Sequence, residues 1–467
     1  MNKRLYALLL ALCMAVTCLA GCNSGSVQTE KETEAVAEVP AETTAGTSVE
    51  AEVIDYAGIV QLDMNSATLK QEVTVKSFID GDTTHFYVPN SVVENGLLKA
   101  RYLAVNTPES TGKIEEWGKK ASKFTREKLE GAESIIIESD DGNWNLDSTG
   151  GRHLVWVWYK SAGSDSYRNL NIELLQNGLS VASKSAENQY GEICMEAIAQ
   201  AKAQELNVHS KKKDPDFFYG DALPVTLKEL RTNIKMYEGM KVAFEGVITK
   251  ENSQTVYVEE YDAETDMYYG MTVYYGFNLT GTGLEILNEG NRVAFVGSVQ
   301  YYETGGTWQV SDIKYVDMRP NDPNNVQLIS SGHEPAYRPI TAAQLSGETV
   351  TMEVWAGQDS DVSTIQTFEY AQLVLSTSVS MENLQVTDVY TTKNEDSASK
   401  GAMTLTCKTT DGQYVSVRTV VLRDANGDVI TADAYRGKTI NVCGIVDYFS
   451  GDYQIKVFTP DDITVVG

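Results

Sequence analysis

A short strand-like pattern recurs three times in the second half of the chain. Residues 242–246 read Val-Ala-Phe-Glu-Gly, residues 293–297 read Val-Ala-Phe-Val-Gly, and residues 440–444 repeat the form as Ile-Asn-Val-Cys-Gly. The second and third copies are each followed by two aromatic residues, a glycine turn and another aromatic residue. Because such repetition indicates related β modules, we predict two OB-type Greek-key barrels at residues 223–320 and 345–467. The proline-containing stretch between them is typical of a linker.

The length and the charge of the chain limit the classes of function. Its 467 residues suggest about three domains. The formal net charge of -27, from 38 basic and 65 acidic residues, argues against a protein whose whole surface coats nucleic acid, because such binding depends on Lys and Arg. Residues 216–467 hold 17 basic and 35 acidic residues, whereas residues 70–215 hold 18 and 21. If any segment binds a polyanion, we expect it to be residues 70–215.

The N-terminus has the features of an export signal. A basic start, an apolar stretch and the ending Leu-Ala-Gly-Cys resemble a bacterial lipoprotein signal at residues 1–21. The resemblance implies that Cys22 carries diacylglycerol and anchors the protein at the extracellular face of the bacterial cytoplasmic membrane. An ordinary signal peptide or an uncleaved anchor is the alternative, although the apolar stretch is short for a membrane span. Residues 22–56 are almost free of aromatic residues, which predicts a flexible acidic stalk.

Cysteine and histidine residues give little support to metal chemistry based on sulfur or nitrogen. Outside the signal, the cysteines are Cys194, Cys407 and Cys443, with no Cys-x-x-Cys pair, and the four histidines are scattered. This pattern does not fit a zinc site. Cys407 and Cys443 could form a disulfide in an oxidising compartment or remain free thiols, and the sequence leaves both possibilities open.

Residues 57–215 have the pattern of a mixed β and α domain. Apolar residues alternate on both sides of an Asp-Gly turn at residues 80–81, which predicts a β-hairpin. Three more strands are expected near residues 101–105, 135–138 and 154–159, and helical spacing is found over residues 118–131, 170–179 and 193–206. These elements fit a small five-stranded barrel with three helices. The whole chain is therefore predicted to be mainly β with some α.

Several residues of this domain could form a site for phosphodiester chemistry. Hydrolysis requires neutralisation of charge on the phosphoryl oxygens, for which a guanidinium is well suited, and Arg101 and Arg152 are the candidates. An oxygen-seeking cation such as Ca²⁺ could be held by Asp82 together with the loop at residues 106–107. Glu109 follows that loop and could orient or deprotonate the attacking water. Asp80 would support the site from behind the direct ligands.

Four pieces of this domain together resemble the staphylococcal nuclease family. They are Asp-Gly-Asp-Thr at residues 80–83, Arg-Tyr-Leu-Ala-Val-Asn-Thr-Pro-Glu at 101–109, Trp-Gly-Lys-Lys-Ala-Ser-Lys-Phe-Thr at 117–125 and Gly-Arg at 151–152. The resemblance implies a nuclease-type OB barrel with three helices, which cuts DNA or RNA to 3′-phosphate products. It further implies that Arg101, Glu109 and Arg152 are catalytic, and that Asp82, Asn106 and the carbonyl of Thr107 bind Ca²⁺.

The sequence departs from the family pattern at three places, and these affect the binding of Ca²⁺ and of the substrate more than the cleavage of the bond. Asn106 stands where the family has Asp, which keeps an oxygen but removes a negative charge and should lower the affinity for Ca²⁺. The loop at residues 147–152 is one residue longer than in the family and lacks its tyrosine. Ser183 and Ser185 replace an expected aromatic pair, which removes stacking worth about 1–3 kcal/mol per base.

These observations lead to three hypotheses for the function. The first is a cell-surface nuclease assisted by Ca²⁺. The second is a degenerate nuclease-fold protein that binds nucleic acid or a surface polymer without cleavage. In the third, the C-terminal modules bind a wall polymer or a protein and determine where the chain is located.

Two further groups of residues have more than one interpretation. The three lysines at residues 211–213 are typical of a solvated helix end but could contact phosphate. Aromatic residues of the C-terminal modules could stack bases, as OB barrels do, or fill the barrel cores. The acidic balance of this region opposes the binding of a nucleic-acid strand. The aromatic residues are Tyr301, Tyr302, Trp308, Tyr448 and Phe449.

Overall fold

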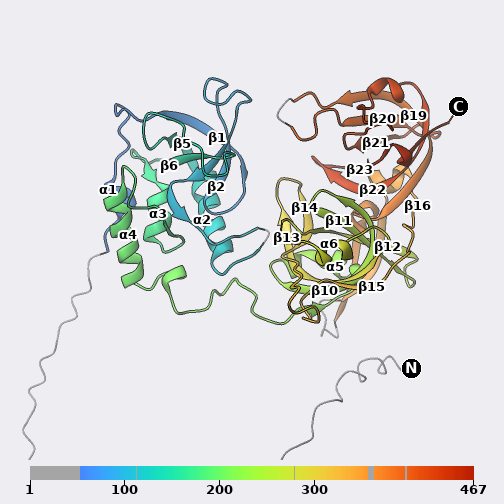
Figure 1. Cartoon of the computed structure of the whole chain (residues 1–467), viewed down its shortest axis with the longest axis horizontal. Coiled ribbons are helices and arrows are strands. Elements are labelled where there is room, and N and C mark those ends of the chain that lie inside the picture. The colour runs from blue at the N-terminus through green and yellow to red at the C-terminus, as the bar shows by residue number, and fades with distance from the viewer. Residues whose placement is uncertain (1–52, 112, 278, 356–361, 395–396, 467) are drawn as a thin grey trace, which may run out of the picture. The chain divides into compact units, whose positions relative to one another are not determined.

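The computed structural model describes residues 53–111, 113–277, 279–355, 362–394 and 397–466 (Figure 1). The predicted signal at residues 1–21, the lipidation site Cys22 and the predicted stalk as far as residue 52 lie outside the described residues. In the described part, no helix is both long enough and apolar enough to cross a lipid bilayer. The described residues contain three β-barrels, which we call the N-terminal barrel (residues 70–161), the middle barrel (residues 241–311) and the C-terminal barrel (residues 378–457).

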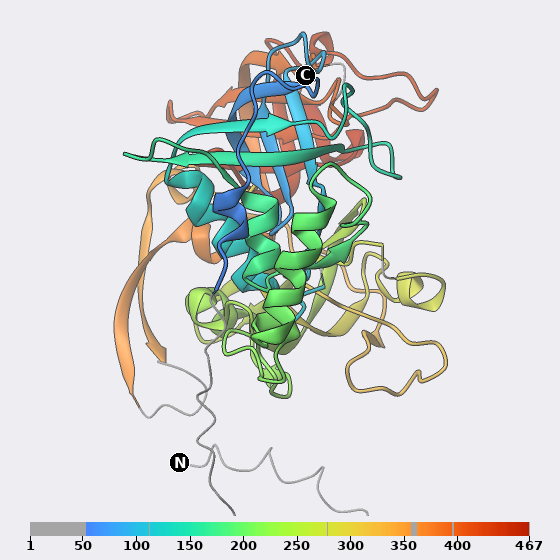
Figure 2. The same ribbon diagram turned by 90° about the vertical axis from the view of Figure 1, so that its left-hand side faces the viewer.

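The N-terminal barrel closes five strands into one sheet (Figure 2). The strand order is β3-β2-β1-β5-β6, and pairing between β3 and β6 joins the two ends. The β3–β6 pairing is parallel and the other pairings are antiparallel. The five strands are β1 (Lys70–Phe78), β2 (Thr83–Tyr87), β3 (Leu97–Tyr102), β5 (Ala132–Glu138) and β6 (His153–Ser161); the short strands are β4 (Ala104–Asn106), β7 (Arg168–Asn169) and β8 (Val181–Ser183).

The three helices predicted for this domain are present. They are α2 (Gly118–Glu130), α3 (Leu170–Gln176) and α4 (Gly191–Ala203), and a short helix α1 (Tyr56–Ile59) precedes the barrel. The side chain of Asn169 starts α3 by accepting the N–H of Ile172 at 3.1 Å, as helix-capping residues do. Trp156 and Trp158 of β6 are fully buried in the hydrophobic core. The predicted fold class, mainly β with helices on a barrel, is confirmed.

The folded part of this domain begins earlier than the sequence analysis placed it. The carboxylate of Asp55 accepts two hydrogen bonds from the guanidinium of Arg168, at 2.7 and 2.8 Å. Tyr56 is buried, and the backbone of Ile54 makes two hydrogen bonds of 2.9 Å with the side chain of Gln200. Residues 53–56 therefore belong to the domain and not to the stalk. The sequence could not show this, because the partner of Asp55 lies 113 residues away along the chain.

The middle and C-terminal barrels repeat the topology of the N-terminal barrel. If the five strands of each barrel are numbered in chain order, their order around the barrel is one-two-three-five-four, and strand four pairs with strand one to close it. In all three barrels, strands three and five pair in parallel. The closing pairs are β10–β13 in the middle barrel and β19–β22 in the C-terminal barrel. This is the five-stranded Greek-key barrel expected of OB modules. The near-identical segments at 242–246 and 293–297 turn out to be the two strands that close the middle barrel.

Short elements surround these two barrels. The middle barrel consists of β10 (Lys241–Asn252), β11 (Thr255–Asp262), β12 (Met267–Tyr274), β13 (Arg292–Tyr302) and β14 (Thr307–Ser311), with β9 (Leu223–Pro224), β15 (Gln327–Ser330), α5 (Leu227–Thr232) and α6 (Thr282–Ile286) around it. The C-terminal barrel consists of β19 (Ser378–Thr391), β20 (Met403–Lys408), β21 (Tyr414–Thr419), β22 (Thr439–Phe449) and β23 (Asp452–Val457), with β16 (Arg338–Pro339), β17 (Thr349–Trp355), β18 (Ser363–Glu369), β24 (Ile463–Val466), α7 (Ala342–Ser346) and α8 (Tyr370–Leu373).

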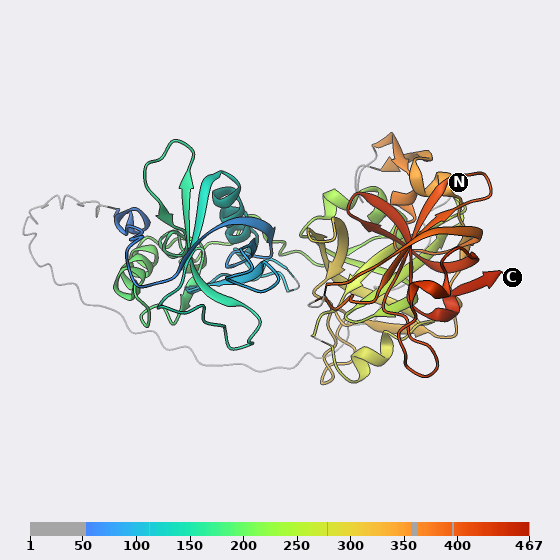
Figure 3. The same cartoon turned by 90° about the horizontal axis from the view of Figure 1, so that it is seen from above.

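A single cluster of buried apolar residues extends through the middle and C-terminal barrels, whose strands are green to yellow and red in Figure 3. A buried carboxylate also connects them. Glu259 is 2 % exposed and accepts hydrogen bonds from the N–H of Ser378 at 2.7 Å, from the Oγ of Ser378 at 2.8 Å and from the N–H of Ala336 at 2.9 Å. The predicted linker is therefore fixed by hydrogen bonds at Ala336 and by the pairing of β16 with β19.

Replacing Glu259 with alanine is expected to lower the free energy of unfolding by about 1–3 kcal/mol, because three donor groups would lose their acceptor. Burial raises the pKa of Glu259, and the hydrogen bonds from Ser378 and Ala336 oppose this rise only in part. A carboxyl with a raised folded-state pKa stabilises the fold most below its unfolded pKa, and this contribution is lost as the pH rises through the folded pKa.

The stability difference between wild type and Glu259→Ala should therefore be larger at about pH 5 than at about pH 8. Thermal unfolding followed by circular dichroism measures this difference. Glu264→Ala removes an exposed carboxylate of the same barrel and serves as the control. Equal effects of the two substitutions would contradict the role assigned to Glu259.

The two cysteines whose state the sequence left open are free thiols in the structure. Cys407 lies on β20 and is buried, and Cys443 lies on β22 and is partly exposed. Cys194, which is buried on α4, is also a free thiol. The apolar packing of the C-terminal barrel therefore does not include a disulfide between Cys407 and Cys443.

Candidate active site

The turn between β1 and β2 carries two of the predicted site residues. Asp82 is fully buried, and its Oδ2 accepts the N–H of Thr107 at 2.8 Å. Asp80 is 6 % exposed and accepts the N–H of Asp82 at 3.1 Å. Between them, Gly81 has no room for a side chain, because a Cβ there would lie 2.9 Å from atoms of Ala121 and Thr107. The turn thus holds both carboxylates against α2 and the loop that follows β4.

Arg101 of β3 connects Asp82 to Asn106. One nitrogen of its guanidinium donates to Oδ1 of Asp82, and the other donates to Oδ1 of Asn106 at 2.5 Å. The N–H of Asn106 donates to the Oγ of Ser180 at 2.8 Å, which fixes the end of β4. The two side chains that the family resemblance assigns to Ca²⁺ therefore contact the same guanidinium.

Glu109 is positioned by the backbone that leads into α2. A Cβ on Gly118 would lie 2.2 Å from the carbonyl oxygen of Glu109, so only glycine permits this approach of the helix to the loop. The same carbonyl accepts the N–H of Glu115 at 2.9 Å. One residue before the helix, the N–H of Trp117 donates to the carboxylate of Asp214 at 2.6 Å. These contacts fix the backbone of Glu109 and the loop that leads from it to α2.

Arg152 is positioned by a carboxylate of its own loop. Its Nε donates to Oδ2 of Asp147 at 2.7 Å, and its carbonyl accepts the N–H of Asp147 at 2.8 Å. Desolvation acts to raise the pKa of Asp147, but hydrogen bonds from Thr149 and Arg152 outweigh it and lower this pKa to about 2. Asp147 is therefore ionised at neutral pH. The side chain of Arg152 remains 34 % exposed and is accessible to a ligand.

The three predicted catalytic side chains interact electrostatically. Burial raises the pKa of the Glu109 carboxyl, and the charge of Asp82 adds to this rise. The positive charges of Arg101 and Arg152 both oppose the rise. Direct contacts join Arg101 of β3 to Asp82 and Asn106. Among the described residues, no hydrogen bond or ion pair joins Arg152 or the Glu109 carboxylate to this group.

The oxygen atoms around Asp82 have the chemistry of a site for a hard cation. Burial raises the pKa of Asp82 to about 7, and the nearby charge of Asp80 adds to the rise. Buried carboxylates that repel one another are stabilised by a cation. The hydroxyl of Thr107 is buried without a hydrogen-bond partner among the described residues. The described residues contain no cluster of three or more His, Cys, Asp or Glu that could hold a metal alone, so the neutral oxygens of Asn106 and Thr107 would have to complete the ligand set.

The segment that replaces the expected aromatic pair lies beside Asn106. Strand β8 pairs antiparallel with β4, so that Val181 lies opposite Asn106 and Ser183 lies opposite Ala104. Ser185 is 3 % exposed, and its hydroxyl donates to the carbonyl of Ala104. The sequence analysis treated these serines only as lost stacking residues. In the structure, Ser185 supports the strand that carries Asn106.

The sequence analysis missed the residues that position the site. Asp214, Ser180 and Ser185 act through hydrogen bonds to residues far away in the sequence, for which no periodic pattern exists. Asp147 holds Arg152 through several hydrogen bonds within their own loop. Gly118 lies inside a quoted motif, but its close approach to Glu109 becomes visible only in three dimensions.

The three lysines at residues 211–213 are exposed. The Nζ of Lys213 lies over the ring of Tyr219, 4.5 Å from the ring centre. This arrangement fits the interpretation of a solvated segment. The structure does not join these lysines to the site residues through any described hydrogen bond.

A five-stranded OB barrel with packed helices, carrying two arginines around buried carboxylates, characterises a nuclease-fold domain. Residues 99–211 match the family model described as staphylococcal nuclease homologue. The match includes Arg101, Asn106, Glu109 and Arg152, whereas Asp80 and Asp82 precede it. The resemblance found in the sequence motifs is thus confirmed for this domain. The match ends before the middle and C-terminal barrels begin.

Proposed function

We propose that the protein is a phosphodiester hydrolase that cleaves DNA or RNA with the assistance of Ca²⁺ and leaves 3′-phosphate products. The proposal rests on one observation, which is that the guanidinium of Arg101 contacts both the buried Asp82 and Asn106 in the domain that matches the family model, while the side chain of Arg152 stays 34 % exposed. Hydrolysis of an anionic diester requires positive charge for the phosphoryl oxygens and a base for the water, and Arg101, Arg152 and Glu109 would supply them. The family match of this domain supports a nucleic acid as the substrate.

Each of the three side chains has a separate task in this proposal. Glu109 accepts a proton from a water molecule whose oxygen attacks phosphorus. Arg101 and Arg152 bind the non-bridging oxygens and offset the negative charge that accumulates on them. The bond between phosphorus and the 5′ oxygen breaks, and the leaving oxygen takes up a proton. The phosphate therefore stays on the 3′ side.

Asp82, Asn106 and the carbonyl of Thr107 would hold Ca²⁺, which supplies further positive charge next to the phosphoryl oxygens when it is bound. Oδ1 of Asn106 also accepts a hydrogen bond from Arg101. The cation and the guanidinium must therefore share this oxygen, or Arg101 must turn from Asn106 toward the substrate. With one acidic ligand fewer than the family pattern, the site is expected to need Ca²⁺ at the concentrations typical of extracellular modules, about 10⁻⁴–10⁻³ M.

Replacing Asn106 with aspartate is expected to lower the Ca²⁺ concentration for half-maximal cleavage at least about tenfold, because the variant adds a negative charge to the ligand set. The measurement is cleavage of single-stranded DNA by the full-length protein over a Ca²⁺ titration, with a chelator as the zero point. Treatment of the products with a 3′-phosphatase, followed by primer extension, identifies the product ends. Absence of cleavage by both wild type and Asn106→Asp at millimolar Ca²⁺ would refute the proposed activity.

We further propose that the protein acts outside the cell, anchored to the membrane through lipidated Cys22, with a wall polymer or a protein as an additional partner of the C-terminal modules. The support is the lipoprotein-like sequence of residues 1–22 and the acidic composition of residues 216–467. Mass spectrometry of the membrane-extracted protein tests the first part. An unmodified Cys22 in that sample would exclude the lipid anchor.

A second candidate function is binding of nucleic acid without cleavage. It is favoured by the contacts of Arg101 with Asp82 and Asn106, which occupy the guanidinium that hydrolysis needs. Binding of single-stranded DNA that is unchanged in Glu109→Gln, together with no turnover in wild type, would support this function. Turnover that is lost in Glu109→Gln would exclude it.

A further inference from the structure

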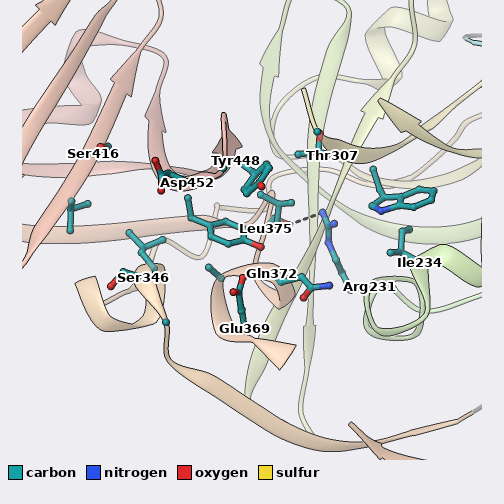
Figure 4. A pocket seen from close by; sticks show the side chains of 18 of the residues that line it. Arg231, Ile234, Thr307, Ser346, Glu369, Gln372, Leu375, Ser416, Tyr448 and Asp452 are labelled. Carbon is teal, nitrogen blue, oxygen red and sulfur yellow. Dashed lines mark hydrogen bonds between the residues drawn. The ribbon is translucent and has the colours of Figure 1, made fainter. Parts of the chain in front are cut away.

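A pocket of about 690 Å³ opens between the middle and C-terminal barrels (Figure 4). Arg231 of α5 and Ile234, which precede the middle barrel, face Tyr448 and Asp452 of the C-terminal barrel across it. The volume lies within the range of small-molecule sites, about 300–1,000 Å³. The pocket contains none of the residues assigned above to phosphodiester hydrolysis. It is therefore a separate candidate site.

Two equivalent hairpins contribute aromatic side chains to this pocket. In the middle barrel, Tyr301 of β13 pairs with Trp308 of β14, and their ring centres are 5.1 Å apart. In the C-terminal barrel, Tyr448 of β22 pairs with Tyr453 of β23 in the same way, at 5.0 Å. A Cβ on Gly306 would lie 3.3 Å from the ring of Tyr448, so the two hairpins meet at this point. The repeated motif found in the sequence thus supplies both walls.

The pocket covers the part of the C-terminal barrel that OB modules use for ligands. OB modules bind oligonucleotides and oligosaccharides on the face of strands two and three and on the loop between strands four and five. Strands two and three are β20 and β21, and Thr406, Tyr414 and Ser416 of these strands line the pocket. The loop between β22 and β23 contributes Gly451, and Asp452 follows it at the start of β23.

A buried arginine stands at the base of the pocket. Arg231 is 3 % exposed, and its Nε donates to the carbonyl of Gly270 at 2.7 Å. One terminal nitrogen donates to the carbonyl of Leu375 at 3.0 Å and to the hydroxyl of Ser376 at 3.3 Å. The other terminal nitrogen makes no hydrogen bond with a described residue, and Arg231 has no ion pair among the described residues. This nitrogen is not among the buried atoms that lack a partner, so it can donate a hydrogen bond to a ligand or to water in the pocket.

The charges that line the pocket balance each other. Arg231 and Lys235 supply two positive groups, and Glu369 and Asp452 supply two negative groups. The side chains of Ser346 and Gln372 add neutral donors and acceptors. A polyanion would meet two carboxylates here, in a region with 35 acidic and 17 basic residues. A neutral ligand rich in hydroxyl groups avoids this repulsion and can donate to both carboxylates and accept from the guanidinium.

We propose that this pocket binds an uncharged oligosaccharide. The aromatic rings of the two hairpins would contact the apolar C–H faces of the sugar rings, while Glu369, Asp452 and Arg231 would hydrogen-bond to the hydroxyl groups. Burial of a flat apolar face against aromatic rings and exchange of water for fixed polar partners are the two contributions to affinity. The proposal gives the C-terminal half of the chain a ligand that is independent of the nuclease domain.

Isothermal titration of the full-length protein with cellohexaose, chitohexaose and maltohexaose tests the proposal. At least one hexasaccharide is expected to bind with a dissociation constant below about 1 mM, and this affinity should not change with salt because the ligand carries no charge. Tyr448→Ala and Tyr301→Ala should each weaken binding about tenfold through loss of one aromatic contact from the two hairpins. Phe449→Ala is the matched control, because this neighbouring ring is 63 % exposed and does not line the pocket.

Three results would overturn the proposal. The first is the absence of binding for all three hexasaccharides. The second is equal weakening by Phe449→Ala and by the pocket variants. The third is displacement of a bound hexasaccharide by a twelve-nucleotide oligo(dT) whose affinity falls with salt, since this result would identify a nucleic-acid site. Thermal unfolding of each variant shows whether a loss of binding reflects a loss of folding.

Discussion

Substitution of Arg152 by alanine is expected to reduce kcat/KM for cleavage of single-stranded DNA by about 10³–10⁵, the range found when an arginine that stabilises the phosphoryl transition state is removed. The guanidinium is held by Asp147, is accessible from solvent and acts on Glu109. Arg152→Lys should recover only a small part of the activity, because an ammonium cannot bind two oxygens in the planar geometry of a guanidinium.

Lys99→Ala is the control for Arg152→Ala. Lys99 lies on β3, two residues from Arg101, and is exposed. Lys99→Ala removes one positive charge from the domain, as Arg152→Ala does, but it does not alter any of the site residues. The unfolding temperatures of both variants should stay close to that of wild type. Comparable loss of activity in Lys99→Ala and Arg152→Ala would show that the total charge of the domain matters and not the position of Arg152.

Substitution of Glu109 by glutamine should lower kcat by about 10²–10⁴ with little change in KM, since glutamine keeps the shape and a hydrogen-bonding oxygen but cannot take a proton from water. Single-turnover cleavage at saturating DNA measures the chemical step directly. Glu127→Gln is the control, because Glu127 lies on α2 of the same domain and, among the described residues, pairs only with the exposed Lys123, at 3.8 Å. A full rate in Glu109→Gln would exclude Glu109 as the proton acceptor.

Much of the fold could be predicted because it depends on local patterns. The alternation around the Asp-Gly turn gave the β1–β2 hairpin, and apolar spacing gave α2, α3 and α4. All three repeated segments form strands, and the first two are paired strands of one barrel while the third belongs to the next barrel. What local patterns cannot show is pairing at a distance. The contact between Asp55 and Arg168 was missed for this reason, and residues 53–56 were assigned to the stalk.

The candidate site was predictable only as a set of residues. Sequence motifs named Asp82, Arg101, Asn106, Glu109 and Arg152, and the structure joins the first three of these through the guanidinium of Arg101. Their supports could not be named, because a single hydrogen bond between distant side chains leaves no periodic signal. The aromatic hairpins were noticed, but the sequence could not show that those of two barrels would meet in one pocket. Their roles in catalysis and binding remain predictions.

The common strand order of the three barrels has a consequence for how the chain acquires its structure. In each barrel the first strand pairs with the fourth, which is synthesised much later. Closure of the barrel therefore depends on contacts between segments that are distant in the sequence, and such contacts form slowly. Sequences as similar as residues 242–246, 293–297 and 440–444 can also capture each other's partners. Synthesis from the N-terminus limits such exchange, because the middle barrel can close before the strands of the last barrel exist.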